Sequence, residues 1–188
     1  MAKKDLWATI GLDKPESWIN IFITGENATG KTSLVKALVD QEFSNDYKPT
    51  ICMNVFVKKL EIDDDEVTLV CWDFAGQNKG DIEKGWNEVR RLYEEGAAGA
   101  LIVGDLARKQ TFSQIVEFWA PDMKKRKGEN IPIMIIANKS DLPRKASAED
   151  LEECKSEVGA IGVMETSAKN GDNVSDAFTT LARTILGL

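Results

Sequence analysis

The residues with the clearest chemical meaning form a glycine-rich stretch behind the first apolar run of the sequence. Residues 25–32 read GENATGKT, a full match to the pattern G-x-x-x-x-G-K-[ST]. Glycines let the backbone curl so that its N–H groups point into one hollow, and the following helix turns its positive dipole end toward the same hollow. Lys31 can reach the β- and γ-phosphates, and Thr32 can ligate Mg²⁺. The stretch predicts a site for a nucleoside triphosphate and Mg²⁺ but does not indicate the base.

Two later loops carry groups that could bind a base. Residues 138–141 (NKSD) follow the apolar run 131–137. The carboxylate of Asp141 can accept paired hydrogen bonds from N1–H and N2–H₂ of guanine, a donor pair that adenine lacks. Residues 166–169 (TSAK) could donate a backbone N–H to the guanine oxygen. Taken alone, each loop is explained equally well as a surface turn or a helix lead-in.

A third candidate loop, DFAGQ at 73–77, follows another strand-like run. Asp73 could hold Mg²⁺ through water, and the backbone N–H of Gly76 could reach a γ-phosphate. The amide of Gln77 can orient water but is not a strong base. On its own the pattern D-x-x-G is more often a plain exit from a strand.

The segments that must position these loops alternate between the strand-like and the helical spacing of apolar residues. Strand-like runs lie at 18–24, 55–62, 67–72, 100–103, 131–137 and 163–166, and helical patterns at 31–39, 112–127, 148–158 and 174–186. Residues 63–66 (DDDE) predict an acidic turn in a hairpin. The alternation predicts a P-loop type, three-layer α/β/α fold. We expect a mostly parallel six-stranded sheet, one antiparallel edge strand and about five helices. Ligands of such sheets bind at the carboxyl ends of the strands, where all these loops fall.

Composition excludes several classes of function. The 188 residues carry 31 acidic and 24 basic side chains, a formal charge of −7 that disfavours a grip on nucleic acid. The absence of histidine excludes a Ser-His-Asp triad and a histidine-ligated metal. The three scattered cysteines predict reduced thiols in a cytoplasmic protein. No apolar run approaches the length of a transmembrane helix. We expect one domain at 18–188 after an N-terminal extension at 1–17.

Taken together, in this order and each at a strand end, the motifs resemble the small Ras-like GTPases, most of all the Rab and Ras branches. The resemblance runs from about Trp18 to Leu186 and adds a switch segment at 43–51 (FSNDYKPTI). It implies that Phe43 lies edge-on to guanine, that Tyr47 covers the phosphates and that Thr50 ligates Mg²⁺ and senses the γ-phosphate. Plain packing within the loop would also account for the two aromatic residues.

The resemblance implies a molecular switch that binds GTP or GDP with Mg²⁺ and slowly hydrolyses GTP to GDP and phosphate, in signalling or intracellular trafficking. Lys31, Thr50 and Gln77 would be catalytic, and Thr32, Thr50 and, through water, Asp73 would hold Mg²⁺. Effectors, exchange factors and GTPase-activating proteins would bind a monomer through switch segments 43–54 and 73–95. The implied nucleotide-binding residues are Gly25, Asn27, Ala28, Thr29, Gly30, Lys31, Thr32, Ser33, Phe43, Tyr47, Thr50, Gly76, Asn138, Lys139, Asp141, Ser167, Ala168 and Lys169.

Two departures from the family pattern concern hydrolysis. Asn27 stands where Ras proteins have glycine, so a side chain beside the γ-phosphate predicts slow intrinsic turnover. The stretch from Gln77 to Gly96 is several residues longer than is usual in the family and contains Arg90 and Arg91. The spacing of its apolar residues fits an amphipathic helix. A second hypothesis is that Arg90 or Arg91 acts as an arginine finger from the same chain, which would stabilise charge in the transition state of hydrolysis.

Two other functions stay open at this point. A binding module that holds nucleotide with negligible turnover is favoured by Asn27 and the altered segment after Gln77. A small P-loop kinase is disfavoured because residues 138–141 would then have no role. Neither Ala2 nor the C-terminal residues predict a lipid anchor, although Leu6, Trp7 and Ile10 have the spacing of a short interfacial helix. The same spacing fits a short stretch that packs on the domain or frays, so a soluble protein and recruitment to membranes through a partner or this segment both stay open.

Overall fold

The computed structural model describes residues 17–39, 53–74 and 96–188. The strands are β1 (Trp18–Thr24), β2 (Met53–Ile62), β3 (Asp65–Phe74), β4 (Ala97–Asp105), β5 (Ile133–Asn138) and β6 (Gly162–Thr166). The helical segments are α2 (Lys31–Leu38), α4 (Gln110–Gln114), η1 (Ile115–Trp119), α5 (Ala120–Lys127), α6 (Ala148–Val158) and α7 (Val174–Leu186).

The strands form one six-stranded sheet in the order β2-β3-β1-β4-β5-β6. All neighbours are parallel except β2 and β3, so the predicted antiparallel edge strand is confirmed. Asp63 and Asp64 form the turn between them, with φ of 50° and 70°. Two successive left-handed residues match the twist of a tight hairpin, which explains why the turn is shorter than the predicted 63–66.

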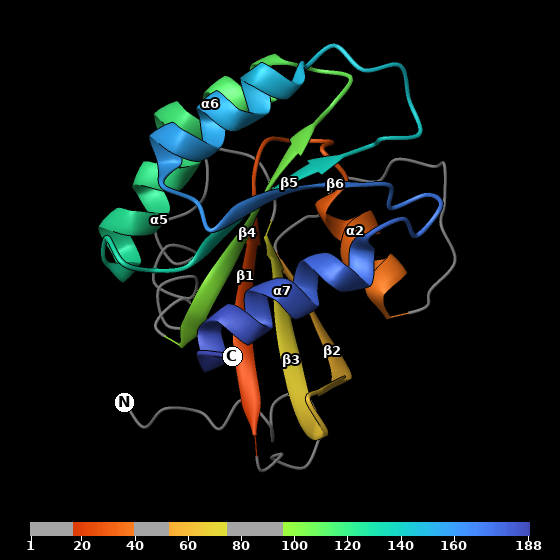
Figure 1. Cartoon of the computed structure of the whole chain (residues 1–188), viewed down its shortest axis with the longest axis vertical. Helices are drawn as coiled ribbons and strands as arrows, with labels where there is room; N and C mark the ends of the chain where they lie inside the picture. Colours follow the sequence, from red (N-terminus) through yellow and green to blue (C-terminus); the bar gives the residue numbers. More distant parts are fainter. Residues whose placement is uncertain (1–16, 40–52, 75–95) are drawn as a thin grey trace.

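Alternation along the strands divides the apolar side chains between the two faces of the sheet. In β1, Ile19, Ile21 and Ile23 join the core under α2 and α7, while Phe22 joins the core under α4, α5 and α6. Figure 1 shows α2 and α7 together, and α5 and α6 together away from them. The predicted three-layer α/β/α arrangement with a buried central sheet is therefore confirmed.

The helical pattern predicted at 112–127 is one continuous helical path that changes type in the middle. It begins as α4, widens into the π-helical segment η1 and returns to α-helix in α5. Pro121 occupies the first turn of α5. Proline cannot donate an N–H, and its ring clashes with the carbonyl four residues earlier. A wider turn just before Pro121 relieves that clash, a reason that apolar spacing does not reveal.

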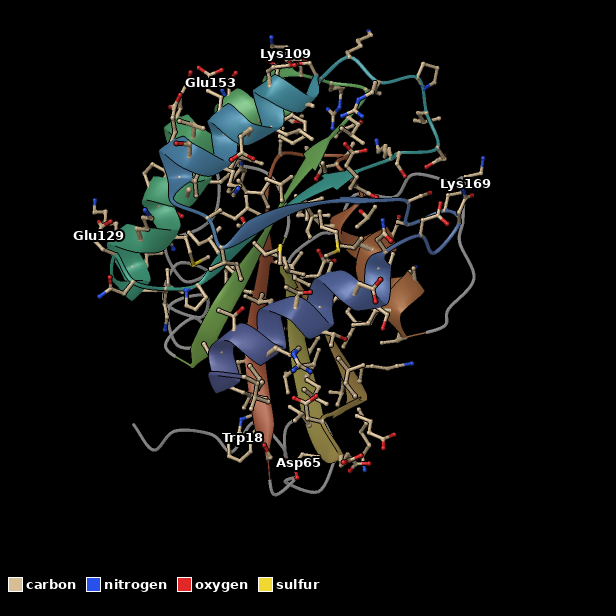
Figure 2. The ribbon with its side chains drawn as sticks, in the orientation of Figure 1. Trp18, Asp65, Lys109, Glu129, Glu153 and Lys169 are labelled. Atoms are coloured by element: carbon tan, nitrogen blue, oxygen red, sulfur yellow. The ribbon has the colours of Figure 1, made fainter. Side chains whose placement is uncertain are left out.

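Three strands end in polar residues, and two of them, β4 and β5, extend beyond the apolar runs at 100–103 and 131–137 that predicted them. Asp105, Asn138 and Thr166 are the last residues of β4, β5 and β6, and they are register partners across the sheet. The parallel register therefore brings three polar strand ends into one row at the edge where the loops lie. In Figure 2, Trp18 and Asp65 mark the opposite end of the sheet from Lys109. Among the described residues, no helix is long and apolar enough to cross a membrane.

Candidate nucleotide-binding site

The loop between β1 and α2, residues 25–30, has a shape that depends on two glycines. Gly25 and Gly30 have φ of 133° and 95°, a region that L side chains rarely adopt. A Cβ on Gly25 would lie 2.4 Å from the carbonyl oxygen of Val103, and one on Gly30 would lie 2.3 Å from Asn138 Nδ2. The loop is thus pressed against β4 and β5 so closely that no side chain fits at either position.

The five carbonyl groups of residues 25–29 all accept hydrogen bonds from side chains. Lys31 Nζ donates to the first two, those of Gly25 and Glu26, at 3.0 and 2.9 Å. The other three carbonyls accept from side chains outside the loop. The carbonyl oxygen of Asn27 accepts from Arg108 Nη2 at 2.8 Å, that of Ala28 from Lys139 Nζ at 2.7 Å, and that of Thr29 from Asn138 Nδ2 at 2.9 Å. A trans peptide points its N–H away from its C=O, so fixing the last three carbonyls outward directs the N–H groups of Ala28, Thr29 and Gly30 toward the hollow of the loop.

Two N–H groups of the loop donate to carboxylate or amide oxygens, as they would to the oxygens of a phosphate. The N–H of Asn27 donates to Glu26 Oε1 at 2.8 Å, and that of Ala28 donates to Asn27 Oδ1 at 3.1 Å. The start of α2 adds its dipole at the same place. The loop therefore has the curled backbone that its glycines predict, and its binding of phosphate stays a prediction.

Lys31 is 6% exposed, beneath the loop at the start of α2. Burial lowers the pKa of its ammonium to about 8, although the carboxylates of Asp73 and Glu26 act in the opposite direction. A desolvated cation in this position is suited to a polyanionic ligand.

Asp73 and Thr32 meet on the other side of the loop. Thr32 Oγ1 donates to Asp73 Oδ2 at 2.5 Å, and Asp73 is fully buried. Burial raises the pKa of Asp73, while the hydrogen bond from Thr32 and the charge of Lys31 lower it. Asp73 Oδ1 has no hydrogen-bond partner within the described part of the chain. A buried carboxylate oxygen without a partner, next to a hydroxyl, fits the hard oxygen ligands that Mg²⁺ takes.

Asn138 connects three loops at the end of β5. Its side chain is 1% exposed, and its Oδ1 accepts from Thr166 Oγ1 and from the N–H of Ala168, both at 3.1 Å. With the bond from Nδ2 to Thr29, every hydrogen-bonding direction of the amide but one is used within the protein. Asn138 therefore ties the loops 138–141 and 166–169 to the phosphate loop.

The other predicted base contacts lie beside it. Asp141 is exposed, and its Oδ1 accepts from the buried Ser167 Oγ at 2.7 Å, so the two predicted base loops are joined directly. Lys169 is exposed on the loop between β6 and α7, where Figure 2 shows it at the outer edge of the molecule. Ser33 follows Thr32 in the first turn of α2 and is partly buried.

Two residues of this cluster, Asp105 and Arg108, were not among the sequence candidates. Asp105 is 2% exposed, and its Oδ2 accepts from Arg108 Nε and Lys139 Nζ, both at 2.8 Å. Burial alone would raise the pKa of Asp105, but hydrogen bonds from Lys139 and Arg108 hold it below its usual range. The missed signal was an acidic residue directly after an apolar run, the same signal that identified Asp73.

Several predicted residues fall outside the described part of the chain. They are Phe43, Tyr47, Thr50, Gly76 and Gln77 in the two switch segments, Arg90 and Arg91, and the N-terminal residues up to 16.

The fold and this cluster define a P-loop nucleotide-binding protein of the α/β class. A sequence model of the Ras family matches residues 20–187, and the chain belongs to that family. Members of the family are GTP-binding switches that hydrolyse GTP, so the protein is a small GTPase related to the Rab and Ras branches. Family members in general bind GTP or GDP with Mg²⁺ and act through regulators and effectors.

Three relatives resemble the chain along most of its length. The Ras-related protein Rab-1 of Theileria parva is 33% identical over 167 residues, which cover 88% of this chain and 73% of the relative. The Ras-related protein Rab-11C of Dictyostelium discoideum is 33% identical over 177 residues, covering 94% and 76%. The Ras-related protein RABA4a of Arabidopsis thaliana is 35% identical over 170 residues, covering 89% and 72%.

Proposed function

We propose that this protein binds GTP and GDP in the cluster formed by residues 25–33, 138–141 and 166–169 and switches slowly between the two states. The observation that carries the proposal is that the carbonyls of Asn27, Ala28 and Thr29 are held by side chains outside the loop, because this directs the N–H groups of the same peptides toward one hollow. Lys31 and these N–H groups bind the phosphates, and Asp141 accepts from the guanine base.

Mg²⁺ is assigned to Thr32 and Asp73, with Thr50 as the expected third contact. A bound Mg²⁺ would neutralise charge that develops on the phosphate oxygens. The structural support is the buried Oδ1 of Asp73, which has no hydrogen-bond partner among the described residues, together with the Thr32 hydroxyl beside the same carboxylate. Because Asp73 is fully buried, its ionised form depends on stabilising neighbours such as the Thr32 hydroxyl, the Lys31 ammonium and a bound cation.

For hydrolysis, we assign water positioning to Gln77, sensing of the γ-phosphate to Thr50 and charge stabilisation to Lys31. Attack of water on the γ-phosphorus depends on position and electrostatics rather than on a strong base. Asn27 supports slow turnover, because its side-chain oxygen already accepts from the N–H of Ala28 at 3.1 Å. A hydrolysis rate near zero would favour a module that holds nucleotide without turnover.

The remaining proposals rest on family membership. Effectors, exchange factors and GTPase-activating proteins would bind segments 43–54 and 73–95, which bracket the described β2–β3 hairpin. We infer a monomeric, cytoplasmic protein, and any association with a membrane would depend on a partner or on its N-terminal segment.

Competition binding in the presence of Mg²⁺ tests the function directly. We expect GTP and GDP to displace a fluorescent guanine nucleotide far better than ATP and ADP do. Asp141→Asn should remove much of that preference, because an amide cannot accept both guanine hydrogen bonds. Asp176→Asn changes an exposed aspartate on α7 and serves as the matched control. Equal binding of adenine nucleotides by the wild type would contradict the proposal.

A further inference from the structure

Arg108 lies outside every motif that predicts nucleotide binding, yet its side chain contacts the phosphate loop. Arg108 Nη2 donates to the carbonyl oxygen of Asn27 at 2.8 Å, across 81 positions of sequence. Arg108 Nε donates to Asp105 Oδ2 at 2.8 Å. The guanidinium therefore bridges the end of β4 and the loop that follows β1.

The backbone around Arg108 is also held in place. The N–H of Arg108 donates to the carbonyl oxygen of Asp105 at 2.8 Å, and its carbonyl accepts from Thr111 Oγ1 at 2.8 Å. Asp105 is fixed in turn, because its Oδ1 accepts from the N–H of Ala107 at 2.9 Å. The arginine is only 33% exposed. These contacts favour one orientation of the guanidinium.

One carboxylate oxygen, Asp105 Oδ2, positions two basic side chains that donate to successive carbonyls of the loop. Asp105 Oδ2 accepts from Arg108 and from Lys139, and each of these donates to one loop carbonyl, those of Asn27 and Ala28. A buried carboxylate that shares two cations holds both in fixed geometry.

The two carbonyls lie on either side of the Cα of Ala28, the one residue of the loop other than glycine with a positive φ. Ala28 has φ of 57°, a left-handed conformation that residues other than glycine seldom adopt. The C=O of Asn27 and the N–H of Ala28 belong to one planar trans peptide, so they point in opposite directions. Holding the carbonyl on Arg108 therefore directs the N–H of Ala28 into the hollow.

We propose that Arg108 is a positioning residue for phosphate binding. By holding the peptide between Asn27 and Ala28, it orients the Ala28 N–H toward the phosphates and thereby slows nucleotide release. The proposal rests on the proposed function, because it assumes that this loop binds guanine nucleotide. Arg108 acts through the loop and does not itself touch the nucleotide.

The test compares nucleotide release from the full chain and its variants. The protein is loaded with a fluorescent GDP analogue and Mg²⁺, and release is followed after addition of excess GDP. Loss of a charge-assisted hydrogen bond predicts that Arg108→Ala releases GDP about tenfold or more faster. Arg108→Lys should fall between the two, because an ammonium lacks the fork that reaches both oxygens.

Arg126→Ala is the matched control. Arg126 is 31% exposed, close to the exposure of Arg108, and donates to Asp122 within the same helical stretch. We expect its release rate to stay within about twofold of the wild type, as for most surface changes.

A second readout separates positioning from catalysis and from general damage. The rate constant for hydrolysis of GTP already bound, measured in a single turnover, should change by less than the release rate in Arg108→Ala. A loss of hydrolysis with unchanged release would overturn the proposal and make Arg108 a charge at the reacting phosphate. If Arg108→Ala does not fold, Arg108→Lys must still show faster release.

Failure of the inference and failure of the proposed function give different results. Guanine-nucleotide binding with the same release rate in the wild type and both Arg108 variants overturns the inference alone. A wild-type chain that retains no guanine nucleotide overturns the proposed function and the inference together.

Discussion

The side chain of Asn138 donates a hydrogen bond from Nδ2 to the carbonyl oxygen of Thr29 at 2.9 Å, although 109 positions separate the two residues. This bond joins the loop proposed to bind the base to the loop proposed to bind the phosphates. Asn138 also accepts from Thr166 and Ala168. Its main role in this structure is therefore to hold three loops together.

Asn138→Ala should weaken GDP binding and destabilise the fold, because three buried partners would lose a hydrogen bond. We expect the free energy of unfolding to fall by about 2–4 kcal/mol, from an order-of-magnitude cost for several unpaired buried groups. Urea unfolding and a nucleotide titration measure the two effects. Asn130→Ala, at an exposed loop position, should change neither. Unchanged nucleotide affinity in Asn138→Ala would contradict the role given to Asn138.

Gly30→Ala should be much more damaging than Gly187→Ala. Both glycines are left-handed, with φ and ψ of 95° and 20° at Gly30 and of 76° and 27° at Gly187, so both alanines carry similar backbone strain. A Cβ at Gly30 would also meet Asn138 Nδ2 at 2.3 Å, whereas nothing lies within 4 Å of one at Gly187. Comparing the free energies of unfolding isolates the steric contact, and only Gly30→Ala should abolish nucleotide binding. Equal losses in both variants would show that strain alone matters.

Asp105→Asn should lower stability at neutral pH by about 1–3 kcal/mol, because it removes the charged acceptor shared by Arg108 and Lys139. The pKa of Asp105 is lowered in the folded state, so its contribution is complete above the ordinary aspartate pKa. It is lost as the pH falls through the lowered folded value. The gap in unfolding free energy between the wild type and Asp105→Asn should therefore shrink on acidification from about pH 6 to about pH 3. Urea unfolding across that range tests this, and a gap that widened on acidification would refute the sign.

Removal of Mg²⁺ should speed GDP release from the wild type and have little further effect on Asp73→Asn. The reason is that the amide takes away the anionic oxygen assigned to the metal. Release is measured with and without a chelator, and Asp176→Asn should respond as the wild type does. A full response to chelation in Asp73→Asn would remove Asp73 from the Mg²⁺ site.

Asn27→Gly should raise the single-turnover rate of GTP hydrolysis severalfold. The change removes the side-chain oxygen that accepts from the N–H of Ala28 and opens space at the phosphate loop. Asn130→Gly makes the same change at an exposed position and should leave the rate unaltered. An unchanged rate in Asn27→Gly would leave slow turnover to another cause.

Features that depend on neighbouring residues could be predicted from the sequence. Glycines at 25 and 30 and the lysine at 31 define a phosphate loop through local backbone freedom. The apolar runs define strands that must be buried, and the topology rules for parallel sheets bring their ends together. Asp73, Asn138 and Ser167 could therefore be predicted at one edge of the sheet.

The contacts by which the loops hold one another could not be predicted, because they depend on how distant segments pack together. The register that aligns Asp105 with Asn138 depends on strands paired across a long stretch of sequence. No local pattern shows that Arg108 reaches the carbonyl of Asn27, because a contact across 81 positions depends on packing rather than on spacing. Hydrogen-bond partners of backbone carbonyls leave no signature in the residue types themselves, since every residue carries the same carbonyl. The shape of the phosphate loop was thus predictable, while the side chains that hold it in that shape were not.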